Sequence, residues 1–193
     1  RRFLRHGIIR LQESGGRMML NVIEDVRNEF KVKLTDKFEE EVISFLNSSG
    51  GNIYIGVNDK GDIIGINGNI DLLQRTIKDR LKDNIMPSTL GLYDVVVMEE
   101  NNKKYIKVII AKGNDDPYYI KGMGLTPDSC FIRVGSSIQS MPYDMINNRV
   151  NKDNVETYLN EFGKYGCNGN FNYDKLGVDA KKLYDMMLDI KNK

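Results

Sequence analysis

Three acidic side chains grouped with one lysine are the residues of this sequence best suited to catalysis. Glu24 and Glu29 lie five residues apart, Lys31 follows them, and Asp59 ends an apolar run. Mg²⁺ and Mn²⁺ prefer carboxylate oxygens and keep coordination positions open for phosphate and water. The spacing predicts that Glu24, Glu29 and Asp59 hold such a metal if the site is catalytic, with Lys31 neutralising charge on a phosphate. The alternative is a solvated acidic surface.

Two further segments contain groups that can hold a nucleic-acid backbone. In the run from Asn47 to Gly51, exposed N–H groups beside the glycines can approach a phosphate. Arg133 and Ser136 follow an apolar run, where a guanidinium and a hydroxyl can bind phosphate oxygens. The predicted nucleic-acid-binding residues are Asn47, Ser48, Gly50, Gly51, Arg133 and Ser136. The alternatives are a helix end for the first segment and an internal salt bridge for the arginine.

Other catalytic classes find little support in the sequence. His6 is the only histidine and the two cysteines form no CxxC pair, which disfavours structural zinc and a Ser-His-Asp site. No GxxxxGK[ST] motif occurs, so a P-loop ATPase is disfavoured. Tyr118 and Tyr119 can stack on bases, but core packing is the favoured interpretation.

Composition indicates one globular domain with an appendage. The 193 residues are 40% hydrophobic and carry a net charge of +1, which gives no support to strong nonspecific binding of nucleic acid. No apolar run is long enough to span a membrane, and we expect a cytoplasmic protein with reduced thiols. Residues 1–17 contain five arginines, one acidic residue and no lysine. We interpret them as a translated, non-native leader before a start at Met18 or Met19.

The hydrophobic patterning predicts an α+β fold, with a mixed, largely antiparallel sheet built from hairpins and flanked by helices. A short strand is expected within 26–34, and Thr35 or Asp36 is expected to cap a helix that Gly50 and Gly51 end. Pro87 is expected to stop an amphipathic helix whose basic outer face, Arg80 included, is solvated. The other expected strands are 53–57 paired with 63–66, 95–98 paired with 105–110, 118–120 and 131–134, and the helices are 70–85, 143–150, 153–162 and 178–191.

Taken in order, these segments resemble the Schlafen AlbA-like domain of the bacterial divergent AAA family. The resemblance covers about residues 20–150. Its motifs are Glu-x4-Glu-Phe-Lys from Glu24, the helix ending in Asn-Ser-Ser-Gly-Gly, Gly-Val-Asn-Asp ending at Asp59, and Phe-Ile-Arg-Val-Gly-Ser-Ser from Phe131. Asn58 departs from the paired aspartates of the family.

The resemblance implies a domain that binds RNA or DNA, common in bacterial proteins regarded as transcriptional regulators. Some Schlafen members are metal-dependent endoribonucleases, and their acidic triad corresponds to Glu24, Glu29 and Asp59. We therefore expect a nucleic-acid-binding domain over 18–150 with a candidate endoribonuclease site. The alternative is a noncatalytic DNA-binding regulatory module. Residues 151–193 are expected to form a helical extension that the chain end cuts short, and a homodimer can rebuild the two-lobed groove of the nucleases.

Overall fold

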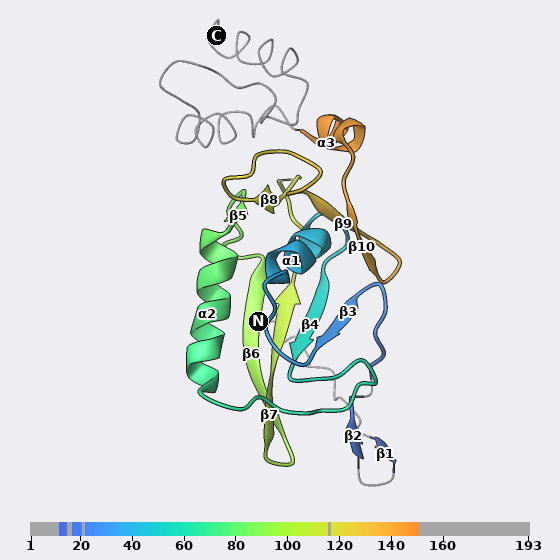
Figure 1. Ribbon diagram of the computed structural model, residues 1–193, viewed down its shortest axis with the longest axis vertical. Coiled ribbons are helices and arrows are strands. Elements are labelled where there is room, and N and C mark those ends of the chain that lie inside the picture. Colours follow the sequence, from blue (N-terminus) through green and yellow to red (C-terminus); the bar gives the residue numbers. More distant parts are fainter. Residues whose placement is uncertain (1–11, 15–16, 21, 116, 151–193) are drawn as a thin grey trace, which may run out of the picture.

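The computed structural model describes residues 12–14, 17–20, 22–115 and 117–150, and it confirms the α+β class (Figure 1). A four-stranded sheet forms its centre. Its strand order is β3 (Asn28–Lys31), β4 (Gly51–Ile55), β7 (Lys103–Ile110) and β6 (Tyr93–Glu100). The β3–β4 pair is parallel and the other two pairs are antiparallel. This makes β3 and β6 the two edges of the sheet.

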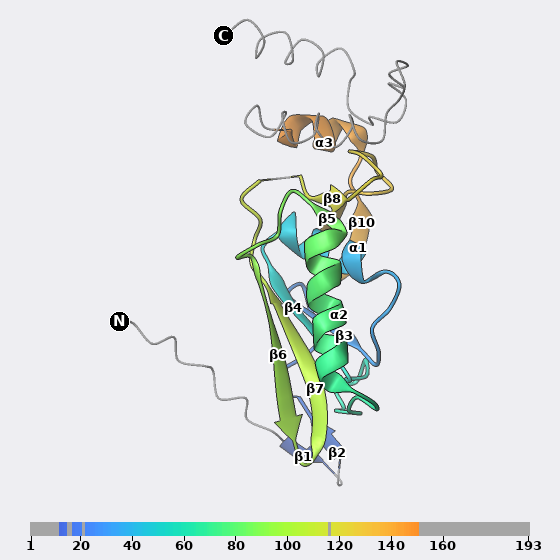
Figure 2. The same ribbon diagram turned by 90° about the vertical axis from the view of Figure 1, so that its left-hand side faces the viewer.

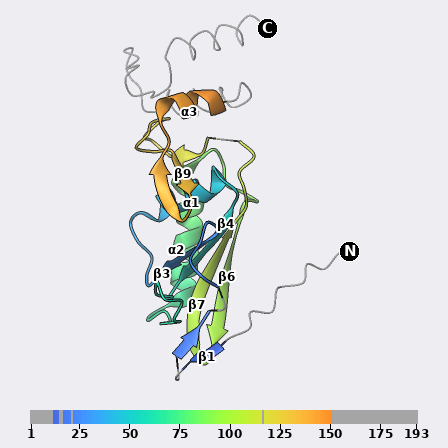
Figure 3. The ribbon, with the colours of Figure 1, turned by 90° about the vertical axis from the view of Figure 1, so that its right-hand side faces the viewer.

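Three two-stranded ladders and three helices complete the described part of the chain. The ladders are β1 (Gln12–Ser14) with β2 (Arg17–Met19), β5 (Ile85–Met86) with β8 (Tyr119–Ile120), and β9 (Phe131–Val134) with β10 (Ser137–Ser140). The helices are α1 (Phe38–Leu46), α2 (Ile70–Asp83) and α3 (Tyr143–Arg149). Helix α2 runs alongside β6 and β7 (Figure 2), whereas β9 and β10 lie beside α1 (Figure 3).

The alternating side chains of the central strands contribute to a core on each face of the sheet. On β4, Ile53 and Ile55 join the main core with α1 and α2. Tyr54 points the other way, into a second core with Phe30 of β3 and Tyr105 of β7. The Phe30 and Tyr54 rings meet edge to face with their centroids 5.6 Å apart. An edge strand packed on both faces holds its side chains in fixed directions.

Helix α2 matches the expected amphipathic pattern but ends two residues earlier than expected. The Asn69 side chain caps its first turn by accepting a hydrogen bond from Leu72 N at 2.9 Å. Ile77 and Leu81 are fully buried. Asn84 follows the helix and β5 begins at Ile85, so Pro87 lies beyond the point where the helix stops.

The expected cap of the first helix is wrong. Helix α1 begins at Phe38 with Lys37 as its N-cap, and no side chain caps it. The carboxylate of Glu39, in the first turn of α1, binds Arg80 and Asn84 at the end of α2.

The short strand expected within 26–34 is confirmed as β3, which pairs in parallel with β4. Two other features differ from the expected strands. The expected partner strand 63–66 makes one antiparallel bridge, between Val57 and Ile63. Residues 137–140 form β10, which was not expected. The hairpin of β6 with β7, the strands β8 and β9, and helix α3 are confirmed.

The expected helices within 151–193, and residues 1–11 and 15–16 of the expected leader, lie outside the described residues. Gln12–Ser14 pairs with Arg17–Met19, across the expected leader boundary. Among the helices of the described ranges, none has the length and apolar character needed to cross a membrane.

Candidate functional site

Strand β3 carries the centre of the predicted acidic site. Because side chains alternate along a strand, Glu29 and Lys31 share one face while Phe30 is buried on the other. The shared face is the one that α1 and β9 approach, since Glu29 and Lys31 contact Arg133 and Glu41 there. The alternation that buries Phe30 therefore places both polar side chains where they can meet other charged groups.

Four charged side chains meet at this face, and we call Glu29, Lys31, Glu41 and Arg133 the charge cluster. Lys31 Nζ lies 2.6 Å from Glu29 Oε1 and 3.3 Å from Glu41 Oε1. Arg133 Nη2 lies 3.0 Å from Glu29 Oε2. Both oxygens of Glu29 thus face a cation. Glu29, Glu41 and Arg133 are buried and Lys31 is half-buried, so solvent screens these ion pairs less than surface pairs.

Arg133 makes the internal salt bridge that was one of its two sequence interpretations. Its side chain is only 1% exposed. Nη2 also donates to the backbone oxygens of Asp25 at 3.1 Å and Ser136 at 3.0 Å. The guanidinium carbon stands 4.3 Å from the centroid of the Phe45 ring. Arg133 therefore fixes Glu29 and ties the turn before β3 to the β9–β10 loop.

Glu24 and Asp59 are exposed, whereas Glu29 is buried. Partial loss of water raises the pKa of Glu24, and the nearby Glu29 carboxylate raises it further by charge repulsion and a hydrogen bond. Lys31 lowers this pKa, and the charge of Asp59 raises it slightly. The structure therefore brings Glu24 next to Glu29 with Asp59 within electrostatic range. Across the described ranges, no three His, Cys, Asp or Glu side chains have metal-holding geometry, and the three-ligand metal set stays a prediction.

Glu41 was missed by the sequence reasoning. It is one of three consecutive acidic residues in the first turn of α1. Acidic residues are favourable there because of the helix dipole, so this pattern gives no indication of a functional role. Burial raises its pKa to about 7, with Lys31 opposing and Glu29 adding to the shift. Its Oε2 is buried with no hydrogen-bond partner among the described residues.

The 47–51 segment forms the helix end that was its alternative interpretation. Asn47 Nδ2 donates to the backbone oxygens of Tyr118 at 2.8 Å and Phe131 at 3.0 Å, and its Oδ1 accepts from Tyr118 N at 2.7 Å. Gly50 has a φ of +70° and donates its N–H to the Phe45 oxygen at 2.9 Å. A Cβ on Gly51 would lie 2.2 Å from the Phe45 ring.

The remaining predicted contact residues differ in their access to solvent. Ser48 is half-buried, and its hydroxyl accepts from Arg133 N at 3.0 Å. Ser136 is exposed in the β9–β10 loop. Tyr118 and Tyr119 are fully buried, which confirms the favoured core interpretation. Of the predicted nucleic-acid contacts, Ser136 is the one whose side chain is openly accessible.

Arg27 is a second residue that sequence reasoning missed. It is exposed in the turn before β3, and its Nη1 donates weakly to the backbone oxygen of Ser49 at 3.5 Å. Asp25 Oδ1 shapes that turn by accepting from Arg27 N at 2.8 Å and Asn28 Nδ2 at 2.9 Å. An exposed guanidinium therefore lies between the acidic residues and the 47–51 segment.

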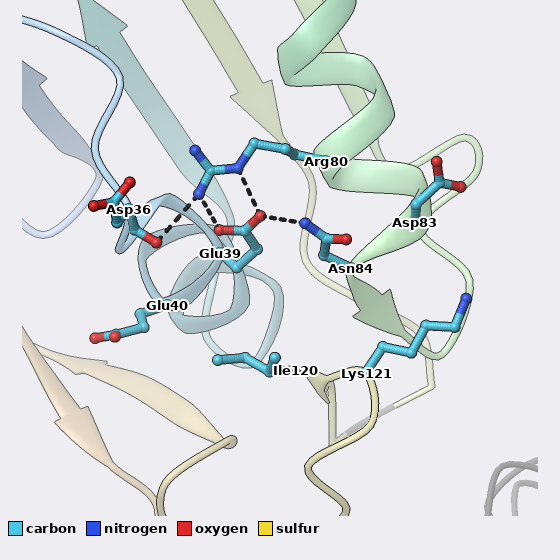
Figure 4. Close-up of a pocket in the computed structure, with 8 residues that line it drawn as sticks. All are labelled: Asp36, Glu39, Glu40, Arg80, Asp83, Asn84, Ile120 and Lys121. Atoms are coloured by element: carbon cyan, nitrogen blue, oxygen red, sulfur yellow. Dashed lines mark hydrogen bonds and ion pairs between the residues drawn. The ribbon is translucent and has the colours of Figure 1, made fainter. Parts of the chain in front are cut away.

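A separate pocket of about 640 Å³ lies between the start of α1 and the end of α2 (Figure 4). Arg80 Nε donates to Glu39 Oε1 at 2.7 Å, Nη1 to the Thr35 oxygen at 2.9 Å, and Nη2 to the Asp36 oxygen at 3.2 Å and to Glu39 Oε2. Burial alone would raise the pKa of Glu39, but hydrogen bonds from Arg80 and Asn84 outweigh burial and lower it. The expectation of a solvated Arg80 is wrong, since this side chain joins the two helices.

Comparison with known proteins gives one family and, among others, two solved structures. The family model described as "Schlafen, AlbA_2" matches residues 24–142. The crystal structure of the DIP2311 protein from Corynebacterium diphtheriae is 20% identical with a TM-score of 0.48, over 72% of this chain and 27% of that one. The solution structure of the N-terminal domain of a RecG-related protein from Nitrosomonas europaea is 23% identical with a TM-score of 0.43, over 52% of this chain and 73% of that one. This chain thus spans about a quarter of the first structure's length, and no curated protein matches it.

Proposed function

The chain belongs to the Schlafen AlbA_2 family, and we propose that it binds nucleic acid and cleaves RNA with a divalent metal at the Glu24–Glu29 site. The nucleic-acid role follows from what the family resemblance implies. The observation that carries the catalytic part is the closeness of two carboxylates. Burial and then the neighbouring Glu29 carboxylate raise the pKa of Glu24, so the two carboxylates lie close enough to repel each other.

The chemistry of these side chains fits a hard divalent cation. Two adjacent carboxylates and the nearby Asp59 offer the oxygen donors that Mg²⁺ and Mn²⁺ prefer, and a cation would relieve their repulsion. When bound, such a metal polarises a phosphoryl oxygen and lowers the pKa of a coordinated water. The chain's own contribution is orientation: Arg133 holds Glu29, and Lys31 places an ammonium beside it for the phosphate.

The accessible groups around this site suggest how a nucleic-acid backbone would lie. Arg27 and Ser136 are exposed, and Arg133 binds the backbone oxygens of both Asp25, two residues before Arg27, and Ser136. A guanidinium and a hydroxyl there can bind successive phosphates, which positions the chain without reading its sequence. In this proposal Asn47, Gly50 and Gly51 act by shaping the surface.

Binding can be tested with labelled tRNA and duplex DNA by fluorescence anisotropy in EDTA at several salt concentrations. We expect Arg27→Gln to weaken binding and to lower the salt slope by about one charge. Arg75→Gln serves as the matched control, because it removes the same charge from an exposed position on α2. Helix α2 packs beside β6, the sheet edge opposite to β3. Equal effects of the two substitutions would contradict this binding face. Sedimentation of the same samples tests the proposed homodimer.

A noncatalytic regulatory module is the second candidate, and one observation favours it. Both oxygens of Glu29 already face cations, Lys31 at 2.6 Å and Arg133 at 3.0 Å. A carboxylate neutralised in this way is a poorer metal ligand, and the acidic residues would then serve structure. DNA binding that resists EDTA, together with no cleavage in Mn²⁺, would favour this function.

A further inference from the structure

Glu41 reaches the candidate site from a different element and has no role in the function proposed above. It lies on α1, and its side chain is only 6% exposed. One carboxylate oxygen binds Lys31 Nζ at 3.3 Å, and the other has no partner in the described part of the chain. Burying a carboxylate this deeply is costly, so a surface acid would have served the fold better.

The charge balance around Glu29 indicates what Glu41 does. Lys31 and Arg133 place two positive charges on the single negative charge of Glu29. Glu41 supplies the second negative charge and takes a share of the Lys31 ammonium. With all four side chains ionised, the charge cluster is neutral. Without Glu41 the cluster would carry one net positive charge beside the proposed metal ligands.

We propose that Glu41 is a positioning residue that shares the Lys31 ammonium with Glu29 and thereby keeps Glu29 able to bind a divalent cation. The inference rests on the proposed metal site. Its physical basis is that a lysine shared between two carboxylates neutralises each of them only in part. The same sharing holds the ammonium beside the site, where a phosphate can reach it.

The substitution Glu41→Gln keeps the shape of the side chain and removes its charge. Lys31 then has one anionic partner, Glu29, and the cluster gains a net positive charge. We expect Mn²⁺ affinity to fall roughly tenfold. The reason is that the substitution removes one negative charge that lies within several ångströms of the dication in a partly screened site. Gln keeps a hydrogen-bonding group, and Lys31 retains an ion pair, so the variant is expected to fold.

Binding of Mn²⁺ itself is the measurement, read from the electron paramagnetic resonance signal of the free ion with the whole chain. Glu40→Gln is the matched control, because it removes the same charge from the neighbouring α1 residue, which lines the other pocket. The double variant Glu41→Gln with Lys31→Met restores a neutral cluster. We expect it to recover the affinity to within about twofold of wild type, a rescue that a merely structural role of Glu41 would not produce.

The outcomes separate this inference from the function on which it rests. Weak binding by Glu41→Gln, normal binding by Glu40→Gln and rescue by the double variant support it. Equal affinities of Glu41→Gln and Glu40→Gln overturn it while leaving the metal site in place, as does a double variant as weak as Glu41→Gln. If wild type binds no Mn²⁺, both the metal site and the positioning role are overturned.

Discussion

Replacing Asn47 by alanine should strongly destabilise this fold, because the Asn47 side chain makes three buried hydrogen bonds. The Asn47 side chain is buried after α1 and joins that helix to two distant segments. Its amide makes hydrogen bonds of 2.7, 2.8 and 3.0 Å with backbone groups of Tyr118 and Phe131. These are the contacts that fix β8 and β9 against α1.

The expected magnitude follows from these three hydrogen bonds. A buried hydrogen bond is worth about 1 kcal/mol net, and a partner group left without one costs about 1–3 kcal/mol. Three bonds lost together, with partial rescue by water, give a loss of about 4 kcal/mol in the free energy of unfolding. Domains of this size are commonly stable by only about 5–15 kcal/mol, so the effect should be large.

Urea unfolding followed by far-ultraviolet circular dichroism measures this loss. Asn52→Ala is the matched control, because the half-buried Asn52 amide donates one 3.1 Å bond, to Asn28. We expect the control to lose about 1 kcal/mol. A loss below about 1.5 kcal/mol for Asn47→Ala would refute the reasoning. If Asn47 instead contacts nucleic acid, RNA affinity should fall under conditions where the variant is fully folded.

Three further substitutions test other parts of the structure. Burial raises the pKa of Glu41 from 4.5 to about 7, so the wild type should lose roughly 3 kcal/mol of unfolding free energy as the pH rises between these values. Glu41→Gln should show a much smaller loss when urea unfolding at pH 5 is compared with urea unfolding at pH 8. Arg80→Met leaves Glu39 buried without a cation and should lower the free energy of unfolding by about 3 kcal/mol in the same assay. A loss within about 0.5 kcal/mol, as is usual for surface substitutions, would contradict this expectation. Gly51→Ala places a Cβ against the Phe45 ring and the Arg27 backbone oxygen and should lower the free energy of unfolding by about 3 kcal/mol; an unchanged melting temperature would contradict this close packing.

Local patterns predicted the elements whose stability is local. The 3.6-residue periodicity of α2 and the alternation of β6 and β7 appear in the structure within a few residues. The closeness of Glu24 and Glu29 also follows from their short separation and from the strand that holds Glu29. In these cases the residues that decide the structure are neighbours in sequence.

Contacts between distant residues explain the failures. Arg133 binds Glu29 across 104 residues, and Arg80 binds Glu39 across 41. Arg80 was expected to be solvated, and an internal salt bridge was one of two interpretations of Arg133, because a sequence pattern does not show which carboxylate a long side chain will meet. The Glu39 carboxylate in the first turn of α1 likewise meets its partners, Arg80 and Asn84, from a distant part of the sequence. Nothing in the sequence singles out Glu41, because two other glutamates directly precede it.

Metal-dependent cleavage of mixed tRNA tests the central claim most directly. Wild type, Glu24→Gln and Asp71→Asn should be compared in Mn²⁺ and in EDTA. Glu24 and Asp71 are both exposed, so neither substitution threatens the fold, and Asp71 on α2 controls for the lost charge. The account predicts discrete products from wild type and Asp71→Asn in Mn²⁺, with none from Glu24→Gln and none in EDTA. Cleavage that persists in Glu24→Gln, or no cleavage by wild type, would contradict it.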